Sequence, residues 1–192
     1  GSVYFLGHHV LFAGKSWYRS WDRKKQHEFS TIFVSFVNSI IQSVCSLYMF
    51  DQYWQGSPMY LTYVRTWIVL FASYMVYDTI ASCALNVHIF RKEPGLILHH
   101  LVVWGSLVTS LFYDERTIFF NIIATLCEVN SIFLHARTLL KFRAPAFSYL
   151  RWPNEFFNFI TYVTFRYMTA GWLVYQSIVL WGDLSNAACV FA

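Results

Sequence analysis

Charged residues are scarce in this chain, since Lys, Arg, Asp and Glu together make up only 12% of its 192 residues. A soluble globular domain usually has about 25%, so a water-soluble globule is excluded. The chain is instead 57% hydrophobic and 21% aromatic. Its apolar residues form successive runs of about twenty, which is the length at which a helix crosses a bilayer. The sequence therefore predicts an all-α, polytopic membrane protein.

Cysteine pairs with metal-binding or redox spacing are also missing. The four cysteines show no CxxC pattern and all lie inside apolar runs, which excludes a disulfide framework and a zinc site. We expect them to pack as small hydrophobic side chains. They are Cys45, Cys83, Cys127 and Cys189.

A basic surface for nucleic acid is lacking as well. The net charge is +4, but the basic residues lie in short connectors between apolar runs, whereas a nucleic-acid-binding protein needs a basic patch on a soluble surface. The expected partners are therefore membrane lipids, and no nucleic acid.

The apolar runs divide the chain into one transmembrane domain, residues 1–192, with six to seven spans. The first run, 2–12, is short for a span, and a last apolar stub follows a polar loop at 182–185. We therefore expect truncation at both ends. The other spans are expected at 29–50, 63–90, 96–113, 117–140 and 155–181.

The connectors alternate in charge, and this predicts the orientation of the bundle. Those after the second and fourth spans hold two basic residues, Arg65 and Arg116, and the others hold ten. The ten-charge side should face the cytoplasm. Its residues are Lys15, Arg19, Arg23, Lys24, Lys25, Arg91, Lys92, Lys141, Arg143 and Arg151.

Ionisable residues inside the spans point to a functional cluster. Asp78, His99, His100, Glu128 and His135 lie within apolar runs, where a charged group costs about 2.5–3.5 kcal/mol. Counting residues from the helix ends places the histidines in the cytoplasmic half and the two carboxylates near mid-membrane. Adjacent side chains on a helix diverge by about 100°, so we expect one histidine of the pair to enter the interior.

The cluster leaves two chemistries open. A carboxylate beside an imidazole suits acid–base work near neutral pH, and His99, His135 and a carboxylate could instead hold a metal. We assign no metal and no other resident cofactor from this spacing.

Polar residues on three spans are candidates for the same interior. Asn38 and Gln42 belong to a serine-rich face of 29–50, which should turn inward either as helix–helix contacts or as a cavity wall. Glu128, Ser131 and His135 share one face of their span. Arg166, about eleven residues into its span, needs a carboxylate or a hydrated cavity, and a structural ion pair with Glu128 or Asp78 is one expectation.

Arg137 follows Glu128 by nine residues. It therefore points to the other side of the helix, where it can extend to the headgroups.

Three segments together resemble the TLC-domain family, named after the translocating-chain-associating, longevity-assurance and ceroid-lipofuscinosis membrane proteins. They are Tyr77-Asp78, His99-His100 and the run Leu126-Cys127-Glu128-Val129-Asn130-Ser131-Ile132-Phe133-Leu134-His135-Ala136-Arg137. The resemblance covers about 24–181 and is nearest the small TLC-domain-containing branch. The functional residues that it implies are Asp78, His99, His100, Glu128, Ser131, Phe133 and Arg137.

The chain departs from the family pattern at several positions. Ile132 replaces the branch's proline, and His135 replaces its asparagine. The ceramide synthases of the family follow their paired histidines with His-Asp and Ser-Asp elements, whereas Cys127-Glu128-Val129-Asn130 stands here. The missing aspartates argue against acyl-CoA-dependent N-acyl transfer.

The resemblance implies a role in lipid synthesis, sensing, transport or membrane composition. We favour a non-enzymatic protein that binds acyl chains, sphingolipid or phospholipid within its helix bundle. One alternative is a structural subunit of a larger membrane complex. Another is a lipid acyltransferase that uses His99 or His100 as catalytic base and acyl-CoA as co-substrate. The expected location is the endoplasmic reticulum or a related endomembrane, or the mitochondrial inner membrane for a complex subunit.

Overall fold

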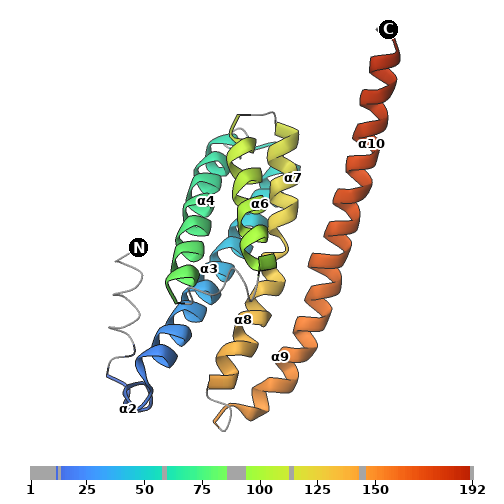
Figure 1. Cartoon of the computed structure of the whole chain (residues 1–192). Coiled ribbons are helices and arrows are strands. Elements are labelled where there is room, and N and C mark those ends of the chain that lie inside the picture. The colour runs from blue at the N-terminus through green and yellow to red at the C-terminus, as the bar shows by residue number, and fades with distance from the viewer. Residues whose placement is uncertain are drawn as a thin grey trace.

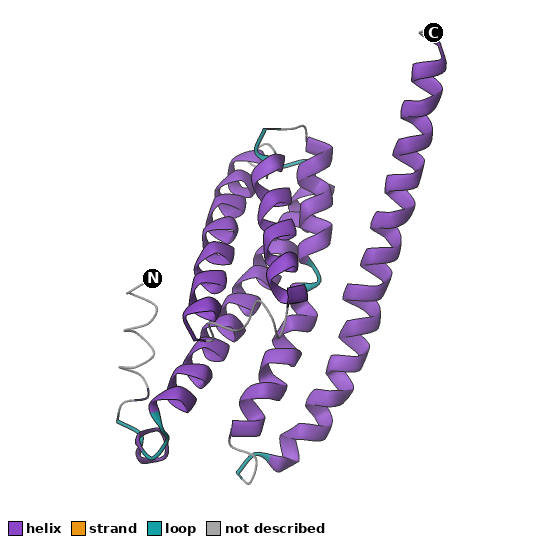
Figure 2. Cartoon of the chain, in the orientation of Figure 1, coloured by secondary structure: helices purple, strands orange, loops and turns teal. Residues whose placement is uncertain are grey.

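The computed structural model describes residues 12, 14–57, 60–85, 94–112, 115–142 and 146–190. All regular secondary structure in these ranges is helical (Figure 2), which confirms the expected all-α fold. The expected first span lies outside the described residues except for Phe12. In chain order the helices are α2 (Ser16–Arg19), α3 (Arg23–Trp54), α4 (Tyr60–Leu85), α6 (Pro94–Ser110), α7 (Glu115–Thr125), α8 (Glu128–Phe142), α9 (Ser148–Thr161), the π-helix η1 (Tyr162–Tyr167) and α10 (Met168–Val190).

Helix α3 is the longest element and exceeds the span expected at 29–50. Its N-cap, Asp22, accepts a hydrogen bond from the backbone N–H of Lys25 at 2.7 Å, which satisfies one free donor of the first turn. Its 32 residues extend for about 48 Å, so its polar first turns project beyond a hydrocarbon layer about 30 Å thick. The chain leaves α3 through Gly56, whose φ of 63° is left-handed and favours glycine.

The helices pack with polar groups inside and apolar groups outside. On α3, Ser39 and Ser46 are buried while Ile41 and Val44 are exposed. Exposed apolar side chains also cover α4, α6 and α10, as expected where the solvent is lipid. In the described chain, Arg23–Trp54 and Ile118–Phe142 are long and apolar enough to cross a membrane, and Ile97–Ser110 is a shorter apolar helix.

The apolar core occupies the half of the bundle away from the basic end. Val64 and Ile68 of α4, Leu107 of α6, and Ile118 and Ile122 of α7 are almost fully buried there. Figure 1 shows α3, α4, α6 and α7 side by side in this half. The other half of the interior is left for polar side chains.

The expected fifth span, 117–140, is not one continuous helix. It is divided between α7 and α8 by a turn at Leu126 and Cys127. The backbone N–H groups of Leu126, Cys127, Val129 and Asn130 bond to carbonyls three residues back, as in a 3₁₀ turn. Thr125 also directs its hydroxyl to the carbonyls of its own helix, which bends helices. Glu128 thereby becomes the first residue of α8.

The last part of the chain differs from the expected connector at 141–154 and from the expected loop at 182–185. Helix α9 already begins at Ser148 and contains Pro153, and α10 continues through 182–185 to Val190. Pro153 is the sixth residue of α9, where it removes one internal hydrogen bond and crowds the carbonyl of the preceding turn; one glycine within a helical pattern is tolerated. Helix α10 extends beyond the other helices in Figure 1. The π-helix η1 lies between α9 and α10 in the chain and contains Arg166.

Candidate functional site

A polar cavity lies in the half of the bundle nearer the basic end. Its volume is about 350 Å³, and it is formed by side chains of α3, α4, α6, α8 and η1. Eight residues predicted from the sequence line it: Asn38, Asp78, His99, His100, Glu128, Ser131, His135 and Arg166. We call it the polar cavity.

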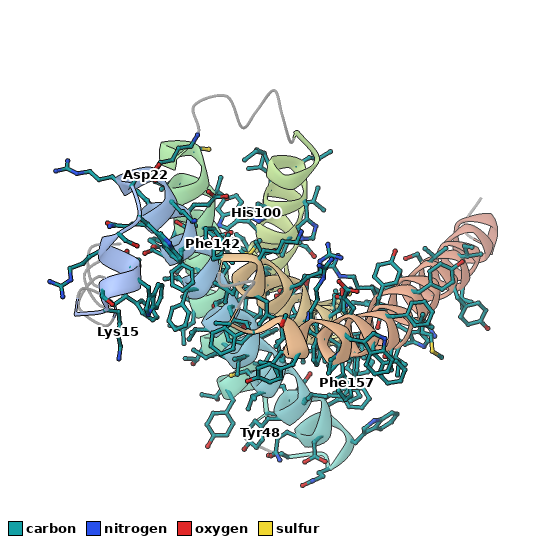
Figure 3. The ribbon with its side chains drawn as sticks, turned by 90° about the horizontal axis from the view of Figure 1, so that it is seen from below. Lys15, Asp22, Tyr48, His100, Phe142 and Phe157 are labelled. Carbon is teal, nitrogen blue, oxygen red and sulfur yellow. The ribbon has the colours of Figure 1, made fainter. Side chains whose placement is uncertain are left out.

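The most ordered feature of the cavity joins α4 to α6. His100 Nε2 lies 3.5 Å from Asp78 Oδ2, and both side chains are largely buried. Asp78 Oδ1 accepts hydrogen bonds from Ser35 Oγ at 3.0 Å and from the Tyr74 hydroxyl at 3.2 Å. Figure 3 views the bundle from the basic end and shows His100 between α4 and α6. The carboxylate is thus held by three helices.

The other ring nitrogen of His100 is also positioned. Nδ1 lies 3.0 Å from Thr79 Oγ1, which directs its own proton to the Met75 carbonyl at 2.8 Å. Thr79 thus holds Nδ1 on one side of the ring, and Nε2 faces the Asp78 carboxylate on the other. Both ring nitrogens are held by side chains of α4, which fixes the orientation of the imidazole. This geometry suits proton exchange with a bound molecule.

Glu128 enters the same cavity from the start of α8. Its Oε2 accepts a hydrogen bond from Ser39 Oγ at 2.9 Å. The turn that ends α7 places this carboxylate in the first turn of a new helix, where the helix dipole favours a negative charge. Glu128 and Asp78 thus meet the serine face of α3 at successive positions, Ser39 and Ser35.

Arg166 does not form the structural ion pair that we expected. Its Nη2 donates to Ser131 Oγ at 3.2 Å, and among the described residues no carboxylate lies within 4 Å of the guanidinium. Its Nε is buried without a hydrogen-bond partner in this part of the chain. Ser131 lies almost one turn past Glu128 on α8, so the guanidinium reaches the helix beside the carboxylate. The cavity therefore contains an arginine whose Nε donor is unpartnered among the described residues.

The two adjacent histidines separate as the helix geometry predicts. His100 is 7% exposed, whereas His99 is exposed, although it also contributes to the cavity lining. His135 lines the cavity from α8. The described residues contain no group of three His, Cys, Asp or Glu side chains arranged to hold a metal, so the metal alternative gains no geometric support.

Three predicted residues lie outside the cavity. Gln42 accepts a hydrogen bond from Trp67 Nε1 at 2.6 Å and donates to Asn38, which makes it a helix–helix contact. Phe133 stacks on Phe157 of α9 with ring centroids 5.8 Å apart. Arg137 is exposed near the end of α8, on the side away from Glu128 as expected. Nothing in this geometry ties these three to the Asp78–His100 pair.

Sequence reasoning missed Tyr74 and Thr79, the residues that orient the pair from α4. Their positions carried a usable signal, because Tyr74 precedes Asp78 by one helical turn and Thr79 follows it directly. Residues four apart share a helix face, which relates Tyr74 to Asp78, whereas Thr79 lies about 100° around the helix from Asp78. Both residue types are common in apolar helices, so neither stood out from the composition.

Comparison with known proteins identifies the family. The TLC domain matches residues 27–189. The chain is 30% identical over 166 residues to TLC domain-containing protein 2 of Danio rerio, covering 84% of this chain and 66% of that protein. It is 26% identical over 156 residues to TLC domain-containing protein 1 of Mus musculus, covering 75% of this chain and 61% of that protein. The chain thus spans about two thirds or less of the length of these relatives.

No solved structure matches the chain. The match to the TLC domain covers most of the sequence and includes the cavity residues of α3, α4, α6, α8 and η1. The chain belongs to the TLC-domain family of membrane proteins, and its relatives are of the small TLC-domain-containing branch.

Proposed function

We propose that the protein binds a lipid, with the polar headgroup in the polar cavity and the acyl chains against the apolar surfaces of the bundle. The observation that carries the proposal is that Arg166, whose Nε has no hydrogen-bond partner among the described residues, lines the same cavity of about 350 Å³ as two carboxylates. Buried charge without a partner is costly within a membrane. A headgroup that hydrogen-bonds to Arg166 would remove that cost.

Location follows from the same proposal. The cavity opens in the half of the bundle that carries the basic connectors, which we expect to face the cytoplasm. The cavity would therefore lie at the depth of the cytoplasmic leaflet, so a lipid of that leaflet could enter it directly. We propose the endoplasmic reticulum or a related endomembrane as the compartment.

The experiment is lipid analysis of the purified full chain. Lipids that co-purify would be identified by mass spectrometry for the wild type, Arg166→Gln and the matched control Arg65→Gln, which alters an exposed arginine on α4. We expect one lipid class at a fixed ratio to protein in the wild type and control, and its loss in Arg166→Gln. Equal lipid content in all three proteins would refute the proposal.

A second candidate function is lipid acyl transfer from acyl-CoA, and the Asp78–His100 pair favours it. An imidazole oriented by a carboxylate can remove a proton from an amine or hydroxyl nucleophile. Labelled acyl-CoA would be supplied with sphingoid and glycerolipid acceptors to the wild type, His100→Ala and His99→Ala. Turnover that is lost in His100→Ala would support catalysis. Absence of turnover in a lipid-loaded protein would leave binding as the function.

A further inference from the structure

A second hollow lies at the basic end of the bundle, apart from the polar cavity. Its volume is about 530 Å³, within the range of about 300–1,000 Å³ that is common for ligand pockets. Its walls are mainly aromatic and aliphatic side chains of α3, α8 and α9, including Phe29, Phe33, Phe36, Ala136, Leu139 and Leu150. We call it the aromatic groove.

A small basic pocket adjoins this groove. It has a volume of about 90 Å³ and is lined by Arg137, Lys141 and Arg151. Leu140 and Phe147 line both hollows, so the two adjoin. The cation cluster therefore stands beside an apolar groove.

The cations are available to a ligand. Arg137 and Lys141 are exposed and form no ion pair among the described residues. Arg151 Nε contacts Glu155 Oε1 at 3.1 Å, with both side chains largely exposed, and such exposed pairs contribute little. The basic pocket thus has an excess of positive charge at the depth of the lipid headgroups.

From this adjacency and the excess positive charge, we propose that the aromatic groove and basic pocket together bind an anionic phospholipid of the cytoplasmic leaflet. The phosphate contacts Arg137, Lys141 and Arg151, and one acyl chain lies along the groove. Arginine and lysine are the side chains that bind phosphate oxygens, and the cytoplasmic leaflet is the one that carries anionic lipid. The cations repel the ammonium of a zwitterionic lipid, which favours a headgroup of net negative charge. This site is independent of the headgroup proposed for the polar cavity.

The test measures lipid binding to the purified full chain by native mass spectrometry, with phosphatidylglycerol and phosphatidylcholine as probes. Three proteins are compared: the wild type, the triple variant R137Q/K141Q/R151Q, and the control K15Q/R19Q/R23Q, which removes equal charge at the same end without altering the pocket lining. We expect phosphatidylglycerol to bind more tightly than phosphatidylcholine to the wild type and the control. Each cation removed from the pocket should weaken phosphatidylglycerol binding by about fivefold.

A second variant addresses the groove and guards against a folding defect. Ala136→Phe fills the groove and leaves every charge in place, and circular dichroism reports whether its helices are intact. We expect it to lose phosphatidylglycerol, whereas Arg166→Gln in the polar cavity should retain it. Equal binding of the two lipids, or binding unaffected by the triple variant, would overturn the proposal. Two other results would also overturn it. One is that palmitoyl-CoA displaces phosphatidylglycerol at a concentration far below that of the phosphatidylglycerol, and the other is that the protein forms a dimer that covers the groove.

Discussion

Asp78 on α4 and His100 on α6 form a buried pair, with Nε2 3.5 Å from Oδ2. The pair links two helices at the edge of the polar cavity, and Ser35 of α3 completes the contact. Because lipid supplies no polar partners for such groups, the pair both stabilises the bundle and marks its polar interior.

Removing one member of the pair should destabilise the protein. Asp78→Asn removes the carboxylate that faces His100 Nε2, and leaving a buried polar group unsatisfied costs about 1–3 kcal/mol. Thermal unfolding in detergent would measure the loss. In a cycle with His100→Gln, we expect a coupling energy of about 0.5–3 kcal/mol. Additive effects would show that the two side chains do not interact.

The contact between Gln42 and Trp67 should also contribute to stability. Gln42→Leu leaves the buried indole N–H without an acceptor, at a cost of about 1–3 kcal/mol. Gln55→Leu, which alters an exposed glutamine at the end of α3, is the matched control and should change stability little. A similar loss in both variants would mean that the Trp67 contact is not the cause.

Asn130 should hold α9 against α8. Its Nδ2 donates to the Asn158 carbonyl, to Asn158 Oδ1 and to Thr161 Oγ1 at 3.0–3.1 Å. Asn130→Ala removes these bonds, so backbone amides of α9 should exchange hydrogen faster, while amides of α4 should not. Unchanged exchange in α9 would contradict this role.

The orientation can be tested by cysteine labelling in a background without native cysteines. Lys24→Cys lies at the start of α3 and Ser57→Cys just beyond its end, about 48 Å apart along a helix of this length. An impermeant thiol reagent applied to the cytoplasmic side of sealed vesicles should label Lys24→Cys only. The reverse pattern would invert the assignment of the basic end.

Part of this site could be predicted from sequence because ionisable residues are rare in apolar membrane spans, and its members are exceptions. Asp78, His100 and Glu128 stand in apolar runs where charge is costly. Counting residues from the helix ends placed His100 in the cytoplasmic half and the two carboxylates near mid-membrane. The partner of Arg166 could not be found in this way. Whether the guanidinium contacts Ser131 or Glu128, close together on one helix, depends on side-chain geometry and not on depth.

The sequence also did not predict where helices are interrupted and where they continue. Hydropathy is uninterrupted through Leu126 and Cys127, so it gives no sign of the turn that ends α7. That turn depends on local hydrogen bonds, including those of Thr125. The π-helix around Arg166 is likewise a change of backbone bonding within an apolar sequence. Conversely, Pro153 suggested a connector and is accommodated near the start of α9.

The most direct test of lipid binding in the polar cavity is an experimental density map of the full chain in lipid nanodiscs. The proposed function predicts elongated density that enters the bundle and ends in a headgroup within hydrogen-bond distance of Arg166, opposite Asp78 and His100. A cavity closed by its own side chains, with Arg166 paired to Glu128 and no lipid between the helices, would contradict it.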